Sequence, residues 1–144
     1  MVLFKLWKYI KIGIFTDSEE HFIEYLKQTN THEYQKEQRK ASLSFLNSKR
    51  TAIDIGANVG LWAKDFCEIF HEVILFEPYK LNIECLKKNL ENYQNFQIFD
   101  CALSNKNSPG ELYIHEKGLG ANSLVPSDGI TKTENIQLKK LDNF

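Results

Sequence analysis

The spacing of hydrophobic residues changes once along this 144-residue chain, near residue 50. Before that point, apolar residues recur every three or four positions, which is typical of amphipathic helices. After it, short runs of consecutive apolar residues alternate with helix-like segments, as in parallel strands that helices connect and cover. The pattern therefore predicts two regions, a helical segment over residues 1–50 and an α/β domain over residues 51–144.

The predicted helix over residues 1–15 is basic on one face and apolar over most of the remainder. Lys5, Lys8 and Lys11 are three residues apart, and Trp7 lies among the apolar positions. Such a helix can lie on an anionic membrane surface, or it can pack against this domain or a partner chain. A secretory signal requires a continuous apolar core, and the lysines prevent one here.

Two further helices are expected before residue 50. Acidic residues follow Asp17 and Ser18 and indicate a helix start, with the helix running to about residue 28. Asn30 begins a second one, which should end near residue 47. There, Leu43 and Leu46 are expected to form its buried stripe, with Phe45 beside them.

Three strands and two helices are predicted for the second region. The strands span 51–55, 73–76 and 96–99, and the helices span 61–70 and 81–90. In the second helix, Leu81, Cys85 and Leu86 are expected to face inward. Strand–helix–strand–helix–strand implies two right-handed crossovers, and hence a Rossmann-like, doubly wound parallel sheet.

The candidate chemistry follows these strands, at the carboxyl edge where open α/β sheets bind ligands. Gly56 and Gly60 bracket the turn after the first strand and would let a ligand approach the backbone. Glu77 follows the second strand, 21 residues after Gly56 and close to the spacing at which an acid reaches ribose hydroxyls. Asp100 ends the third strand and is placed for an adenine amino group. These residues predict a slot that fits adenosine.

Asp54 favours one adenosine cofactor over the others. The turn lacks the middle glycine of the dinucleotide fingerprint, and Asp54 comes two residues before its first glycine. A carboxylate there would repel a pyrophosphate, whereas it suits the cationic amino acid end of S-adenosyl-L-methionine. NAD and FAD are therefore the less favoured cofactors.

The motifs resemble the FkbM-type S-adenosylmethionine-dependent methyltransferases. The resemblance rests on Asp-Ile-Gly-Ala-Asn-Val-Gly at 54–60, Phe-Glu-Pro at 76–78 and Ala-Leu-Ser at 102–104, and it covers about residues 34–144. In that family a polar β-hairpin follows, which segments 110–114 and 122–124 match in character. Residues 137–142 resemble the short strand that precedes the family's fourth core strand.

The resemblance implies a class I methyltransferase fold and O-methylation of a hydroxyl on a saccharide or another small-molecule acceptor. The cofactor contacts that we expect are Asp54 at the methionine end, Gly56, Ala57, Asn58 and Gly60 for backbone approach, Glu77 with Pro78 at the ribose, and Asp100 with Cys101 at the adenine. No residue stands out as the catalytic base, since His71 and His115 are both expected at the surface.

The chain ends before the family's fourth core strand and the acidic loop after it, which face the acceptor. The competing hypothesis is therefore a truncated, non-catalytic fragment that acts as a binding or membrane-associated module. Without the fourth strand, residues 51–55 would form an open apolar edge. We expect that edge to pair in a homodimer or with a partner chain.

Composition narrows the function further. The 18 Lys+Arg and 19 Asp+Glu give a net charge of −1, which does not favour nucleic-acid binding. Cys67, Cys85 and Cys101 fit neither a disulfide framework nor a metal site, so we expect a cytoplasmic protein, with peripheral membrane contact through residues 1–15. Residues 118–123 imitate a dinucleotide loop, but Pro126 follows, which favours a hairpin turn.

Overall fold

The computed structural model describes residues 35–115 and 121–144, so the predicted helices over 1–15 and 17–28 lie outside the described residues. The described elements, in chain order, are α3 (Lys36–Ser44), β1 (Thr51–Ile55), α4 (Leu61–Ile69), β2 (Glu72–Phe76), α5 (Lys80–Asn89), β3 (Phe96–Phe99), β4 (Ala102–Leu103), β5 (Ser108–His115), β6 (Ile130–Lys139) and a 3-10 helix over Leu141–Asn143. Every predicted strand and helix between residues 51 and 99 is confirmed to within one residue at each end.

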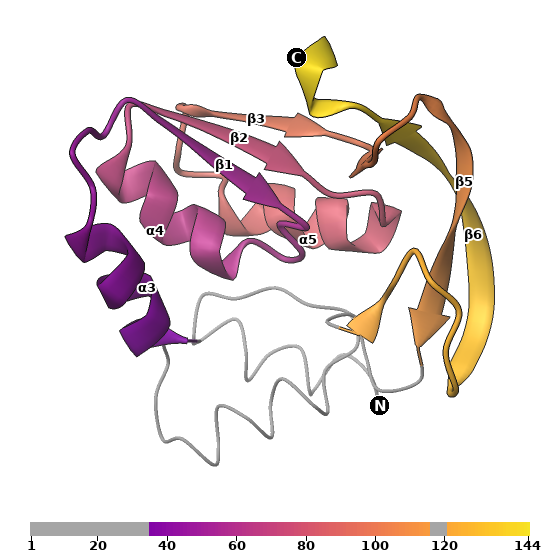
Figure 1. The fold of residues 1–144 in the computed structure, drawn as a ribbon. Coiled ribbons are helices and arrows are strands. Elements are labelled where there is room, and N and C mark those ends of the chain that lie inside the picture. Colours follow the sequence, from indigo (N-terminus) through magenta and orange to yellow (C-terminus); the bar gives the residue numbers. More distant parts are fainter. Residues whose placement is uncertain (1–34, 116–120) are drawn as a thin grey trace.

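A three-stranded parallel sheet in the order β1-β2-β3 forms the centre of the fold. Thr51 pairs with Glu72 at its start, and Ile55 pairs with Phe76 at its end. The connections β1-α4-β2 and β2-α5-β3 place both helices on the same face of the sheet (Figure 1). The structure thus confirms the α/β class and the parallel sheet.

The two faces of this sheet differ in burial because successive side chains of a strand point to opposite sides. Ala52, Val73 and Leu75 point to the helices and are at most 8% exposed, in a cluster that includes buried residues of α4 and α5. On the opposite face, Ile53 and Ile55 are 46% and 60% exposed. In the described part of the chain, β1 hydrogen-bonds only to β2 within its sheet.

Helix α3 is shorter than predicted, and two expected contacts near its end are wrong. It ends at Ser44 rather than near residue 47, so Phe45 and Leu46 follow the last turn and are 82% and 40% exposed. Leu43 does pack against the core. An ion pair between Arg39 and Asp65 joins α3 to α4.

Helix α5 also turns differently from the prediction at its first residues. Leu81 is 36% exposed rather than inward, whereas Asn82 and Ile83 are buried. Leu86 is completely buried, as predicted. The polar Asn82 can occupy an inward position because its side chain hydrogen-bonds to Glu77.

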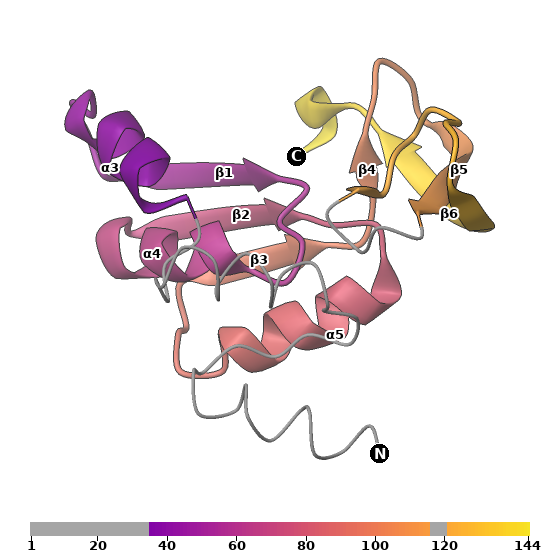
Figure 2. The same ribbon diagram turned by 90° about the horizontal axis from the view of Figure 1, so that it is seen from below.

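A second sheet, in the order β4-β6-β5, stands at the carboxyl edge of the first one (Figures 1 and 2). β5 and β6 are antiparallel, and β4 joins β6 in parallel. Of residues 137–142, which resemble the family's short strand, residues 137–139 form the end of β6, and a 3-10 helix begins at Leu141. Tyr79, 3% exposed, packs with Leu112, Ile114 and Ile136 and so connects the two sheets through their side chains.

Candidate functional site

A cavity of about 240 Å³ opens between the carboxyl edge of the parallel sheet and the second sheet. Its floor consists of Ile55, Gly56, Asn58, residues 76–78 and Asn82, from the ends of β1 and β2, the loop after β1 and the start of α5. Its roof consists of Leu112 and residues 122–124, and residues 101–103 join roof to floor. The predicted slot at the strand ends is therefore a hollow with walls from both sheets.

The loop after β1 is shaped by left-handed backbone conformations. Gly56, Asn58 and Gly60 have φ angles of 77°, 52° and 90°. The backbone N–H groups of Gly56 and Ala57 both donate to the carbonyl of Phe76, at 2.8 and 3.0 Å. A Cβ atom at Gly56 would meet nothing within 4 Å, so the backbone beside the cavity is open to close approach.

Gly60 serves a different purpose. A Cβ atom there would lie 2.5 Å from Cδ1 of Leu86, and Leu86 is completely buried in α5. Its missing side chain therefore allows α4 and α5 to pack closely. Ala57, 4% exposed, belongs to the same hydrophobic cluster as Leu86.

Glu77 is the polar centre of the floor. It is 4% exposed, and Oε2 accepts from the backbone N–H of Asn58 at 2.8 Å. Oε1 accepts from the backbone N–H of Tyr79 at 2.9 Å and from Nδ2 of Asn82 at 3.3 Å. The carboxylate thus ties the β1 loop, the end of β2 and the start of α5 together.

Burial raises the pKa values of two carboxyl groups at this edge, Asp54 and Glu77. Burial, and secondarily the charge of Glu77, raises the pKa of Asp54 to about 6. Burial raises the pKa of Glu77 as well, although its hydrogen bonds to Tyr79, Asn58 and Asn82 act in the opposite direction. Oδ2 of Asp54 is buried and has no hydrogen-bond partner among the described residues. A nearby cation would therefore favour the ionised form of Asp54.

The end of β3 separates two neighbouring predicted contacts. Cys101 is buried and lines the cavity, whereas Asp100 is exposed and does not line it. Burial raises the pKa of the Cys101 thiol above its ordinary value. The expected adenine contact of Asp100 stays a prediction.

The structure brings together five of the nine predicted cofactor contacts. The residues that line the cavity are Gly56, Asn58, Glu77, Pro78 and Cys101. Asp54 lies in β1, and Ala57 and Gly60 lie in the loop after it, but none of the three lines the cavity. Their contacts with a cofactor, like those of the other five, stay predictions.

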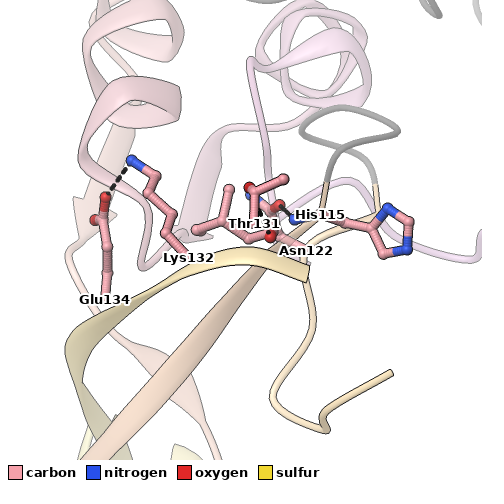
Figure 3. Close-up of polar contacts among 6 residues, drawn as sticks. His115, Asn122, Thr131, Lys132 and Glu134 are labelled. Atoms are coloured by element: carbon pink, nitrogen blue, oxygen red, sulfur yellow. Dashed lines mark hydrogen bonds and ion pairs between the residues drawn. The ribbon is translucent and has the colours of Figure 1, made fainter. Parts of the chain in front are cut away.

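Sequence reasoning missed the roof and Asn82. The inward turn of Asn82 depends on Glu77, so helix periodicity could not reveal it. The sequence indicates only that residues 122–124 match a hairpin in character, and their place beside the strand ends depends on the second sheet. Figure 3 shows this part of the hairpin, where Asn122 lies beside His115. Lys132 forms an ion pair with Glu134, with 2.9 Å between Nζ and Oε1.

The described residues contain neither a cluster of metal ligands nor a helix that could cross a membrane. Over 35–115 and 121–144, His, Cys, Asp and Glu side chains form no group of three that could hold a metal ion. Within the same ranges, none of the helices combines the length and apolar character needed to cross a membrane. His71 is exposed, and His115 is partly buried with Nε2 lying 2.6 Å from the carbonyl oxygen of Asp128.

The chain is similar to a known protein in structure, whereas its sequence alone gives no match. No family model matches the sequence, and no curated protein matches it either. Among solved structures, the chain is similar to the crystal structure of methyltransferase FkbM from Methylobacillus flagellatus KT, with 18% sequence identity and a TM-score of 0.44. The match covers 69% of this chain and 24% of that one, so it spans about a quarter of the length of that protein.

Proposed function

We propose that this chain binds S-adenosyl-L-methionine and acts as a methyltransferase on a hydroxyl of a saccharide or another small-molecule acceptor. The observation that carries the proposal is the cavity at the carboxyl ends of the parallel strands, with open backbone at Gly56 and the buried Glu77 in its floor. Three residues of the motif at 54–60 and all three of the motif at 76–78 line this floor, so the sequence resemblance and the geometry support the same ligand.

The size and polarity of the cavity suit the nucleoside part of the cofactor. Its volume of about 240 Å³ is somewhat below the ~300–1,000 Å³ of typical ligand pockets, so it would hold part of the cofactor. Gly56, Asn58 and Glu77 give the cavity polar lining, as a ribose requires. Ala102, Leu103 and Leu112 give it apolar lining, as a flat base requires.

Glu77 has less capacity for ribose than the sequence suggested. A carboxylate accepts about four hydrogen bonds, and Glu77 already accepts three from groups of the protein. One acceptor position remains, on Oε2. We therefore expect a single ribose hydroxyl to bind Glu77, rather than both.

Asp54 would face the positively charged end of the cofactor. Its carboxyl group comes directly before the loop whose open backbone borders the cavity, and its buried Oδ2 has no partner among the described residues. When bound, S-adenosyl-L-methionine supplies a methyl group that its sulfonium already activates. The task of these residues is then to hold and orient the cofactor. The base and the acceptor site are not assigned.

The cellular location belongs to the same proposal. The three cysteines lie on α4, α5 and the segment after β3, and none of them forms a disulfide. This favours a reducing, cytoplasmic environment. Peripheral membrane contact through residues 1–15 and pairing through β1 stay predictions.

The proposal is tested by isothermal titration of the full chain with S-adenosylhomocysteine, the demethylated product. We expect a dissociation constant in the micromolar range. Gly56→Ala should weaken binding at least tenfold, because the added methyl group enters the open space beside the cavity. Gly129→Ala is the matched control, since Gly129 has a comparable φ of 84° and does not line the cavity.

Two results would contradict the proposal. A folded wild-type chain that does not bind S-adenosylhomocysteine would favour the non-catalytic alternative. Equal weakening by Gly56→Ala and Gly129→Ala would show that backbone strain, rather than loss of space at the cavity, explains the effect.

A further inference from the structure

The roof supplies polar groups to a cavity lining that is otherwise apolar beside them. Residues 101–103 and Leu112 line the cavity and are mainly apolar, and Asp100, the acid expected to recognise adenine, does not line it. Asn122 and Ser123 do line the cavity, and Ser123 pairs with β5 of the second sheet. Recognition of a base beside these apolar residues would therefore depend on residues 122–124.

Hydrogen bonds to the backbone hold this segment in place. Ser123 and Tyr113 exchange two backbone hydrogen bonds, of 2.8 and 3.1 Å, so residue 123 pairs with the edge of β5 that β6 leaves open. The backbone N–H of Val125 donates to Oγ of Ser123 at 3.0 Å. Residues 122–124 thus form a fixed wall at the mouth of the cavity.

The amide of Asn122 has a defined orientation. Its Oδ1 accepts from the backbone N–H of His115 at 3.2 Å, so the other end of the amide is the amino group (Figure 3). That Nδ2 atom is buried and has no hydrogen-bond partner among the described residues. A buried donor without a partner is costly, and an acceptor on a ligand would remove that cost.

Leu124 adds an apolar surface next to this amide. It is 41% exposed although it lines the cavity, and the adjacent Val125 is 68% exposed and does not line it. A flat ring placed in the cavity against Leu124 would cover its side chain and remove apolar surface from water.

We propose that Asn122 and Leu124 bind the base of the nucleoside, with Nδ2 of Asn122 donating to ring nitrogen N1 of a 6-aminopurine and Leu124 covering its ring face. This assignment rests on the proposed function. An asparagine amide presents a donor beside an acceptor, and the adenine edge at N1 presents an acceptor beside an amino group.

The test compares S-adenosylhomocysteine with S-inosylhomocysteine by titration of the full chain. In the deaminated compound, ring nitrogen N1 carries a proton and the amino group is replaced by an oxygen. Wild type should prefer the adenosyl compound by about tenfold or more. Asn122→Asp keeps an oxygen for the N–H of His115 but replaces the donor by an acceptor, so this preference should be lost or reversed.

Asn107→Asp is the matched control for that substitution. Oδ1 of Asn107 likewise accepts a backbone N–H, from Lys140 at 2.9 Å, but Asn107 is exposed and does not line the cavity. It should keep the wild-type preference. An Asn122→Asp variant that still prefers the adenosyl compound as strongly as wild type would overturn the assignment.

A second pair keeps the proposal testable if Asn122→Asp fails to fold. Leu124→Ala should weaken both compounds equally, by about three- to tenfold, because the ring face is the same in both. Val125→Ala should weaken neither. Equal affinities of Leu124→Ala and wild type would remove Leu124 from the site. If wild type binds neither compound, the proposed function itself fails; if it binds both equally well, only the reading of the base by Asn122 fails.

Discussion

The floor and the roof of the cavity are held by different kinds of interaction. In the floor, the buried Glu77 carboxylate accepts three hydrogen bonds, and the glycines of the β1 loop adopt left-handed backbone conformations against a packed core. In the roof, an isolated bridge between Ser123 and Tyr113 joins residues 122–124 to β5, and the Leu124 residue is 41% exposed. Floor substitutions should therefore change stability and binding together, whereas roof substitutions should change binding with little effect on folding.

The largest effect is expected from Glu77→Ala. It removes the common acceptor of the Asn58 and Tyr79 N–H groups and of the Asn82 amide, so the free energy of unfolding should fall by about 3 kcal/mol or more. Urea unfolding measures this. The matched control is Glu72→Ala, at the exposed start of the same strand, where the carboxylate accepts only from Thr51 Oγ1 and the loss should stay below about 1 kcal/mol. Equal losses for the two variants would show that Glu77 does not tie the floor together.

The next largest effect should come from Gly60→Ala. The new Cβ meets the completely buried Leu86 and also requires a left-handed conformation, so we expect a loss of about 2–4 kcal/mol. Gly56→Ala should cost only the free energy of the left-handed backbone conformation, about 1–2 kcal/mol, because its Cβ atom would meet nothing within 4 Å. Thermal or urea unfolding of the two variants gives the comparison. A smaller loss at Gly60 than at Gly56 would contradict the packing role of Gly60.

Asp54 should make stability depend on pH. Its pKa is about 6 in the folded chain against an ordinary value of 3.8, so between these values the unfolded chain releases a proton that the folded chain retains. Stability therefore falls as the pH rises from about 4 to 6 and is level above that range, with an upper limit of about 3 kcal/mol for this group.

Asp54→Asn should remove this part of the pH dependence. The free energy of unfolding of the variant minus that of wild type should then increase between pH 4 and pH 7, as measured by urea unfolding across that range. A difference that stays constant over the range would show that Asp54 titrates normally.

The smallest effect is expected beside the roof, for Thr131→Val. Its Oγ1 donates to the carbonyl of Ile114 at 3.2 Å, next to the bulge at His115, so the loss should be about 0.5–1.5 kcal/mol. Thr133→Val, exposed on the same strand, is the control. Affinity for S-adenosylhomocysteine should be unchanged in both variants. A large loss of stability from Thr131→Val would mean that the roof is as tightly coupled to the fold as the floor.

Prediction from sequence was most accurate where local patterns and packing agree. The strand over 73–76 is marked by a continuous apolar run and the helix over 61–70 by its apolar residues, and both are present within a residue of the expected bounds. Prediction failed where a side chain's direction depends on a distant partner. Leu46 follows the end of α3 and is exposed, and Leu81 turns outward while Asn82 turns toward Glu77.

The sequence by itself determined the order of the elements and the floor of the site, because glycines and acids directly after strands must come to the carboxyl edge of a parallel sheet. Tertiary structure alone decided that donors of the folded chain already occupy three of the about four acceptor positions of Glu77, that Asp100 does not line the cavity, and that residues 122–124 do. The reason is physical. Strand and helix spacing is encoded over a few neighbouring residues, whereas the direction of a buried polar group is set by donors and acceptors that only the folded chain brings within reach.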